Sequence, residues 1–206
     1  MTTFIDGASG ALHGFAITHS WLTPLVIWGT AGFLILCPVG FLVMAFWEWR
    51  LRPGVAALLG LGLTQVVCHE LGRLTYQARP FVVMHFTPLF PHVPNNSFPS
   101  SLTAFAAVAA VIGVLAWRRL GMVFVVGLLV VGFGCVYVGV HYPSDVIAGA
   151  GAGVVSGWVT WLIAGLPPMT MLFRAIERRL PKRRRSMASP AGPRPRDQAR
   201  VATGAS

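Results

Sequence analysis

Long apolar stretches alternate with short polar segments along this chain of 206 residues. Charged residues are rare in the apolar stretches, which cover about 22–47, 55–76, 98–117, 120–141 and 144–166. About 20 consecutive apolar residues are needed for an α-helix to cross the hydrocarbon core of a bilayer. The pattern therefore predicts an all-α fold, a polytopic membrane helix bundle of five spans, or of six if a further segment crosses.

The two ends of the chain differ from this membrane domain, which we place at residues 21–168. Residues 1–20 carry a weak helical pattern of apolar side chains, which predicts an amphipathic segment that is interfacial or helical. Because this segment lacks a basic start and contains Asp6, we do not expect a cleavable signal peptide. Residues 169–206 are basic and poor in apolar side chains toward their end, so we expect a largely disordered tail.

The composition supports a membrane class and limits the possible partners. Hydrophobic residues make up 55% of the chain and charged residues 11%, whereas soluble domains contain about 25% charged residues. Much of the net charge of +10 lies after Phe173, where a juxtamembrane basic cluster is typical of a cytoplasmic segment. No nucleic-acid-binding module accompanies the charge, so we expect no nucleic-acid partner.

The positions of Lys and Arg predict the orientation. Arg50 and Arg52 lie between the first two predicted spans, Arg118 and Arg119 lie between the third and fourth, and the basic tail follows the fifth. With five spans these places share one side of a cell (inner) membrane, which the positive-inside rule makes cytoplasmic. The extracytoplasmic face then receives most of the unusual polar side chains, namely Arg79, His85, His92, Asn95, Asn96, Ser97, Ser100, His141 and Asp145.

His141 and Asp145 end a long apolar run and are the strongest candidates for chemistry. A carboxylate four residues after a histidine can hold one ring nitrogen and leave the other free as a nucleophile or base. Arg79 offers a planar fork suited to phosphate oxygens, and Ser100 and Ser101 with nearby loop amides offer further donors. This combination predicts phosphoryl transfer through a phosphohistidine. With one carboxylate and scattered histidines we expect neither a metal nor another cofactor, and the three cysteines match no metal or disulfide spacing.

Three segments carry a resemblance to a known family. They are A-R-P-F at 78–81, S-F-P-S-S-L at 97–102 and G-C-V-Y-V-G-V-H-Y-P-S-D at 134–145. In order and spacing the chain resembles the type 2 phosphatidate phosphatase superfamily of membrane lipid phosphatases, fold relatives of vanadium haloperoxidases, and most closely its undecaprenyl-diphosphatase branch. The resemblance implies that His141 is the nucleophile, that Asp145 orients it, and that Arg79 and the Ser100 region hold the phosphoryl oxygens.

The chain departs from the family pattern at three positions. Gly72 stands where the first motif has a lysine, and the neighbouring Arg73 either replaces that lysine or pairs with Glu70. Leu102 stands where the family has the histidine that protonates the leaving group. Cys135 stands where the family has a phosphate-binding arginine.

These departures leave two main functions open. In the first, the protein hydrolyses undecaprenyl diphosphate or a related lipid phosphate or diphosphate at the outer face, with His85 or His92 as a possible source of the missing proton. In the second, it is a catalytically impaired family member that binds lipid phosphate without turnover, because losing the acid and an arginine together removes several kcal/mol of transition-state stabilisation. A third function, a transporter-like role, would need a polar path through the membrane, and the inner half of the spans offers little of one.

Overall fold

The computed structural model describes residues 2–48 and 51–179, and these ranges are mostly helical. Five long helices make up the bundle in this described part. They are α2 (Thr23–Glu48), α3 (Leu51–Leu74), α5 (Ser101–Ala116), α6 (Arg118–Tyr137) and α7 (Pro143–Ala164). The shorter elements are α1 (Thr2–Thr18), η1 (Ser20–Leu22), α4 (Pro80–Val83) and α8 (Pro167–Arg179).

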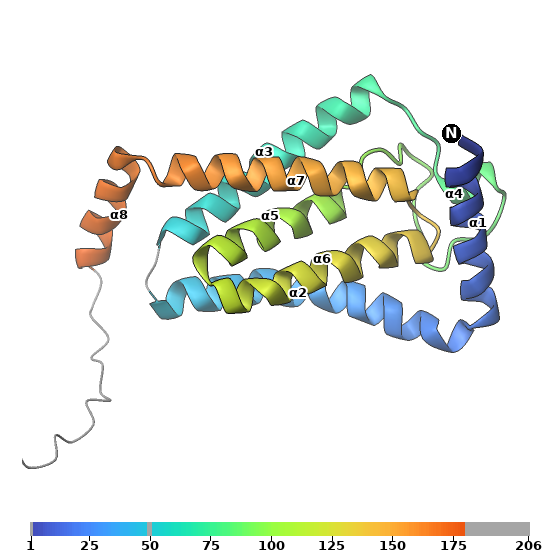
Figure 1. The fold of residues 1–206 in the computed structure, drawn as a ribbon, viewed down its shortest axis with the longest axis horizontal. Helices are drawn as coiled ribbons and strands as arrows, with labels where there is room; N and C mark the ends of the chain where they lie inside the picture. The colour runs from blue at the N-terminus through green and yellow to red at the C-terminus, as the bar shows by residue number, and fades with distance from the viewer. Residues whose placement is uncertain (1, 49–50, 180–206) are drawn as a thin grey trace, which may run out of the picture.

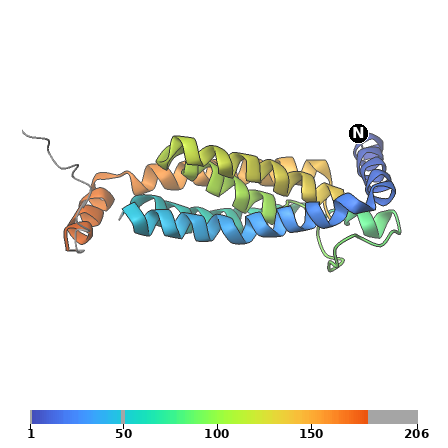
Figure 2. The ribbon, with the colours of Figure 1, turned by 90° about the horizontal axis from the view of Figure 1, so that it is seen from below.

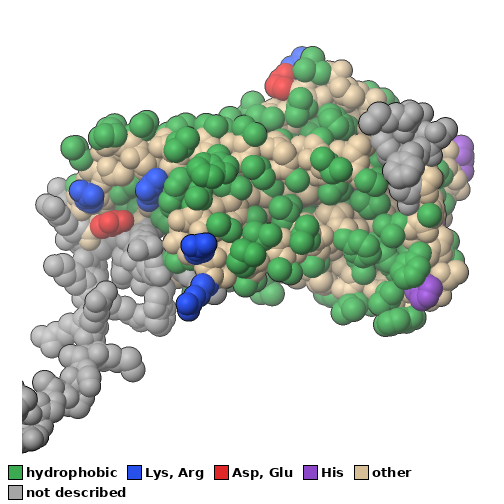
Figure 3. Space-filling model, viewed as in Figure 1, with side chains coloured by type: hydrophobic (Ala, Val, Ile, Leu, Met, Phe, Trp, Pro, Cys, Tyr) green, Lys and Arg blue, Asp and Glu red, His purple; other side chains and the backbone are tan. Residues whose placement is uncertain are grey.

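The five long helices run lengthwise along the molecule, with α3 inclined to the others (Figures 1 and 2). Segments Ser20–Phe41, Leu51–Leu74 and Pro143–Ala164 are long and apolar enough to cross a membrane, and α5 and α6 are shorter apolar helices. Large hydrophobic side chains point outward from several of these helices, so the surface suits lipid rather than water (Figure 3). The prediction of an all-α, multi-pass membrane bundle is confirmed.

Helix α5 packs against α3, α6 and α7, and glycines on α7 allow that helix to approach α5 closely. A Cβ at Gly149 would collide with the Ser100 carbonyl group, and a Cβ at Gly153 would collide with the Ala104 carbonyl group. Small residues permit such close contact between helices in lipid, where there is no hydrophobic force between them. The glycine positions therefore fix where the start of α7 sits against the start of α5.

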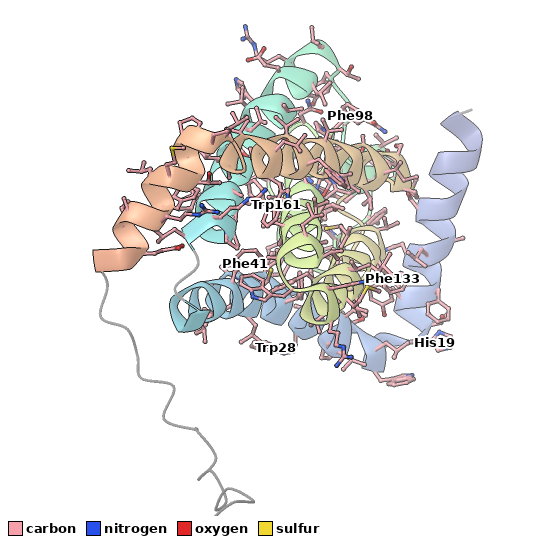
Figure 4. The ribbon with its side chains drawn as sticks, turned by 60° about the vertical axis from the view of Figure 1, so that its left-hand side comes forward. His19, Trp28, Phe41, Phe98, Phe133 and Trp161 are labelled. Atoms are coloured by element: carbon pink, nitrogen blue, oxygen red, sulfur yellow. The ribbon has the colours of Figure 1, made fainter. Side chains whose placement is uncertain are left out.

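One end of the bundle is closed by aromatic side chains and by α8. Phe41 packs edge-on against Trp117, with ring centroids 5.4 Å apart. Arg52 lies over the Trp161 ring at 4.1 Å, and its Nη2 donates to the Trp161 carbonyl oxygen at 3.2 Å. Figure 4 labels Phe41 and Trp161, which both belong to this end. Most of the Lys and Arg side chains visible in Figure 3 lie near α8.

The structure differs from the expected tail at α8. Pro167 and Pro168 end the preceding span as expected, but the chain then continues as a helix to Arg179. A proline in the first turn lacks only an N–H that has no partner inside the helix, so the same residues that stop α7 can begin α8. Residues 180–206, where the rest of the predicted disorder falls, lie outside the described residues.

The opposite end of the bundle is covered by α1, which lies across it rather than along it (Figures 1 and 2). Ala16 of α1 joins a small buried cluster with Tyr137, Val138 and Val140 at the end of α6. The long connection from α3 to α5 and the short connection from α6 to α7 lie at this same end. The sequence-predicted site residues are in and beside these two connections.

Candidate active site

The α3–α5 connection is held in a defined conformation by its own backbone and amide bonds. Ala78 and Asn96 form an isolated antiparallel bridge, and the Ser97 N–H donates to the Gln77 carbonyl oxygen at 2.8 Å. The Asn96 side-chain amide donates to the Gly72 carbonyl oxygen at 2.7 Å, which ties the connection to the end of α3. This loop therefore presents Arg79 and Ser97 to the bundle from fixed positions.

His141 and Asp145 lie together at the start of α7, and both are buried, with Asp145 fully so. Asp145 is in the first turn of the helix, and its Oδ2 accepts from the Tyr142 N–H at 2.9 Å. The same oxygen lies 3.6 Å from Nδ1 of His141. Ser97 Oγ donates to this oxygen at 2.5 Å and lies 3.3 Å from the same imidazole nitrogen. The Asp145 carboxylate and the Ser97 hydroxyl group thus both lie against Nδ1 of the His141 ring. Nε2 is on the opposite side of the ring.

Arg79 lies on that other side and is 5% exposed. Its Nη1 is 3.5 Å from Nε2 of His141 and donates to the Val140 carbonyl oxygen at 2.9 Å. Its Nε and Nη2 both donate to Oδ1 of Asn95, at 2.9 and 2.8 Å. Burial lowers the pKa of Arg79, and the nearby Asp145 carboxylate partly offsets this. A fixed guanidinium group therefore faces Nε2, the second ring nitrogen of His141.

Ser100 and Ser101 lie at the start of α5, next to Asp145. Ser100 is fully buried, and its Oγ accepts from the Thr103 N–H at 3.5 Å as the cap of the helix. The Ser100 N–H donates to the Asp145 backbone carbonyl oxygen at 3.1 Å, so the starts of α5 and α7 are joined. Ser101 is the first residue of α5. The first N–H groups of a helix have no partner inside it and favour anions.

The structure keeps Arg73 apart from this cluster. Its Nη1 lies 3.5 Å from Oε1 of Glu70, and the two side chains are 68% and 55% exposed. The neighbouring Gly72 faces the loop instead, since a Cβ there would lie 3.1 Å from the Phe98 carbonyl oxygen. A lysine at position 72 would therefore approach the loop, whereas the arginine at position 73 pairs on the surface.

Leu102 and Cys135, the other two departures from the family pattern, face a common apolar cavity of about 120 Å³. Cavity walls come from α2, α5, α6 and the loop, and include Ile27, Leu34, Phe90, Val138 and Val140. His92 lies at its border and is the one ionisable side chain other than the Cys135 thiol among the residues that line it. Where the family pattern has a histidine and an arginine, this chain thus has Leu102 and Cys135, whose side chains suit an apolar space.

The structure gives contacts to three side chains for which the motifs state no role. Ser97 bonds the Asp145 carboxylate, Asn95 accepts from the guanidinium group of Arg79, and His92 approaches His141 with ring centroids 6.5 Å apart at 64°. Burial and the charges of Arg79 and His141 lower the pKa of His92. The gathering of polar side chains in the α3–α5 connection is the sequence signal for these three, but spacing alone does not rank them.

No cluster of three or more His, Cys, Asp or Glu side chains that could hold a metal is found among the residues that the structure describes. The donors present are one carboxylate, two imidazoles and a guanidinium group. This set suits a phosphoryl group, because the guanidinium group and helix N–H groups bind anionic oxygens and the imidazole supplies a lone pair.

Comparison with known proteins gives a consistent set of similarities. Residues 53–166 match a family described as the PAP2 superfamily. The chain is 27% identical over 160 residues to undecaprenyl-diphosphatase BcrC of Bacillus subtilis, covering 76% of this chain and 82% of that protein. It is 37% identical over 106 residues to lipid A 1-phosphatase of Rhizobium etli, covering 48% and 44%. The crystal structure of a transmembrane PAP2-type phosphatidylglycerolphosphate phosphatase from Bacillus subtilis has a TM-score of 0.64 at 23% identity, covering 80% of this chain and 86% of that one.

Proposed function

We propose that this chain, which belongs to the PAP2 superfamily, is a membrane phosphatase that hydrolyses undecaprenyl diphosphate or a related lipid phosphate. The observation that carries the proposal is the buried His141, held at Nδ1 by Asp145 with its Nε2 toward Arg79. A nucleophile oriented by a carboxylate and facing a fixed cation is the arrangement that covalent phosphoryl transfer requires.

In the first step, Nε2 of His141 attacks the terminal phosphorus of the substrate. The bond from phosphorus to the bridging oxygen breaks, and its electron pair stays on the departing lipid phosphate. The ring becomes a phosphoimidazolium, whose positive charge Asp145 stabilises from 3.6 Å. Water then attacks phosphorus, the P–N bond breaks, and the electron pair returns to His141 as inorganic phosphate leaves.

Arg79 and the start of α5 are the proposed binding groups for the phosphoryl oxygens. Nη1 of Arg79 already lies 3.5 Å from the attacking nitrogen, so an oxygen on phosphorus would come within its reach. The N–H groups of Ser101 and Leu102 open α5 beside Ser100 and add the positive end of the helix dipole. Arg73, which pairs with Glu70, would need to change its rotamer to take part.

A diphosphate suits this site better than a simple phosphate ester. Leu102 has no proton to give, so a leaving group that needs protonation would depart slowly from this site. General acid catalysis is worth about 10²–10⁴-fold, and a phosphate leaving group needs less of it than an alkoxide. The name of the Bacillus subtilis relative, undecaprenyl-diphosphatase, supports the same substrate class.

The proposed location is the extracytoplasmic face of the cell membrane, with the basic tail in the cytoplasm. Arg52 and Arg118 lie at one end of the bundle and the site lies at the other. The positive-inside rule assigns the end with the arginines to the cytoplasm. A lipid diphosphate headgroup in the outer leaflet would then meet the site directly.

One observation favours the second candidate, a family member that binds lipid phosphate without turnover. Leu102 and Cys135 face an apolar cavity where the family pattern has an acid and a phosphate ligand. The remaining donors, Arg79 and the start of α5, would still bind an anionic headgroup. Binding would then persist while the chemical step is lost.

Phosphate release separates the two candidates. The purified protein in detergent, with a metal chelator present, is given undecaprenyl diphosphate, and inorganic phosphate is measured over a broad pH range. The proposal predicts release by the wild type and none by His141→Gln. A folded wild-type protein that retains the labelled lipid on a binding assay but releases no phosphate would establish the non-catalytic alternative.

A further inference from the structure

His92 is an imidazole that the structure brings close to the ring of His141. Its ring lies 6.5 Å from the ring of His141, centroid to centroid, and nearly perpendicular to it at 64°. It comes from the loop between α4 and α5, so it approaches from a different segment than the His141–Asp145 pair. The other loop histidine, His85, is exposed to solvent with a φ of 54°.

The position of His92 relates directly to the missing family histidine. His92 borders the same apolar cavity as Leu102 and Cys135. A group within one water molecule of the reacting centre can transfer protons there, even when it makes no direct contact in the unliganded protein. At 6.5 Å between centroids the two rings are close neighbours without stacking on each other, so His92 would act on the phosphorylated ring through a water molecule.

The surroundings of His92 favour its neutral form. Burial lowers its pKa, and the positive charge of Arg79 and that of a protonated His141 lower it further. A neutral imidazole has a lone pair that can accept a proton, but it carries no acidic proton for a poor leaving group. His92 is therefore suited to act as a base on water rather than as an acid on a lipid alkoxide.

We propose that His92 is the general base for hydrolysis of the phosphohistidine formed on His141. The inference rests on the proposed function. Nε2 or Nδ1 of His92 takes a proton from water as the water oxygen bonds to phosphorus. The bond from phosphorus to Nε2 of His141 breaks, and its electron pair returns to that nitrogen. The proton on His92 then passes to solvent, and inorganic phosphate leaves.

This assignment also defines the substrate class. A diphosphate needs little proton donation in the first step, because its leaving group is a phosphate, and it uses His92 only in the second step. A lipid monophosphate ester needs an acid in the first step, which neither Leu102 nor a neutral His92 supplies. The site therefore favours lipid diphosphates over phosphate esters, because Leu102 replaces the family's acid histidine and His92 serves only as a base.

The test compares His92→Gln with His85→Asn as a matched control in the same loop. Wild type and variants are mixed with polyprenyl diphosphate labelled in the terminal phosphate, quenched in alkali, and assayed for released phosphate and for label on the protein. We expect His92→Gln to release phosphate about 10²–10⁴-fold more slowly while its phosphorylated fraction rises above that of wild type. Added imidazole should restore part of the turnover, and His85→Asn should behave as wild type.

Each outcome decides one claim. Wild-type turnover in His92→Gln, or slower turnover with no rise in phosphoprotein, would overturn the role of His92 while leaving the phosphohistidine intact. Absence of phosphate release by the wild-type protein, together with absence of label on wild type and variant alike, would instead refute the proposed function. If His92→Gln does not fold, as judged by its elution and thermal unfolding in detergent, His92→Asn gives the same comparison.

Discussion

Replacing Asp145 by asparagine tests the electrostatic core of the mechanism. Asp145 is fully buried, and its Oδ2 lies 3.6 Å from Nδ1 of His141. At an effective dielectric constant of ~20, a carboxylate at this distance attracts a cationic imidazolium by about 4–5 kcal/mol. Asparagine keeps the size and an acceptor but removes the charge that stabilises the phosphoimidazolium. We expect turnover to fall about 10²–10³-fold, which corresponds to about 3–4 kcal/mol.

The same substitution has a calculable effect on folding. Two hydrogen bonds, from Ser97 Oγ and from the Tyr142 N–H, lose a charged acceptor. Bonds to charged groups contribute about 1.5–3 kcal/mol and neutral ones about 0.5–1.5, so the combined loss is about 2 kcal/mol. Oδ1 of Asp145 has no hydrogen-bond partner among the described residues, so an amide N–H₂ group placed there would be buried and unsatisfied. We therefore expect a lower midpoint of thermal unfolding in detergent.

The assay measures phosphate release from undecaprenyl diphosphate below the unfolding temperature of the variant. Glu177→Gln is the matched control, since Glu177 also accepts a backbone N–H, from Leu51 at 3.0 Å, but at the opposite end of the bundle. That control should retain wild-type turnover. A folded Asp145→Asn protein with turnover within threefold of wild type would refute the reasoning.

Three further predictions follow from packing, from the altered motif positions and from burial. Gly149→Ala should lower the free energy of unfolding by about 1–3 kcal/mol and reduce activity, because its Cβ would collide with the backbone of Ser100 at the start of α5. The control Gly151→Ala, at a position that faces open space, should change neither stability nor activity. Equal unfolding midpoints for the two variants would contradict this. The double substitution Leu102→His with Cys135→Arg should raise hydrolysis of a lipid monophosphate up to about 10²-fold, since it returns an acid and an anion ligand, and a folded double variant with no gain would count against the assignment of these positions. Burial lowers the pKa of His92 in the folded protein, so as the pH falls the unfolded state binds a proton on His92 before the folded state does. The free energy of unfolding therefore decreases as the pH falls below the ordinary histidine pKa of about 6.5. Between pH 8 and pH 5 the thermal unfolding midpoint should fall less for His92→Gln than for wild type, and parallel curves for the two proteins would contradict the burial effect.

The spans were predictable from the sequence because length and apolarity alone decide what crosses a bilayer. The predicted span 144–166 corresponds to α7 (Pro143–Ala164), and 120–141 corresponds to α6 (Arg118–Tyr137). The predicted ends of the spans were less accurate than the spans themselves, because backbone geometry decides where a helix ends. Helix α8 was not predicted, because a pair of prolines ends one helix and can also begin another.

The candidate site was predictable in part, for a different physical reason. The motif residues Arg79, His141 and Asp145 are brought together, as their resemblance to the family implied. The hydrogen bond from Ser97 to the Asp145 carboxylate joins residues that lie 48 positions apart in the sequence. No local sequence pattern predicts such a contact. The choice between two roles for Arg73 depended on its rotamer, and in the structure it pairs with Glu70.

The central claim, that His141 carries the phosphoryl group, is tested most directly by locating that group. Wild-type protein is incubated with polyprenyl diphosphate labelled in the terminal phosphate, quenched in alkali, digested, and its peptides are sequenced by mass spectrometry. The account predicts acid-labile label on the peptide that contains His141, and none on the His141→Gln protein. Phosphate release at the wild-type rate by folded His141→Gln, or label on a different residue, would contradict it.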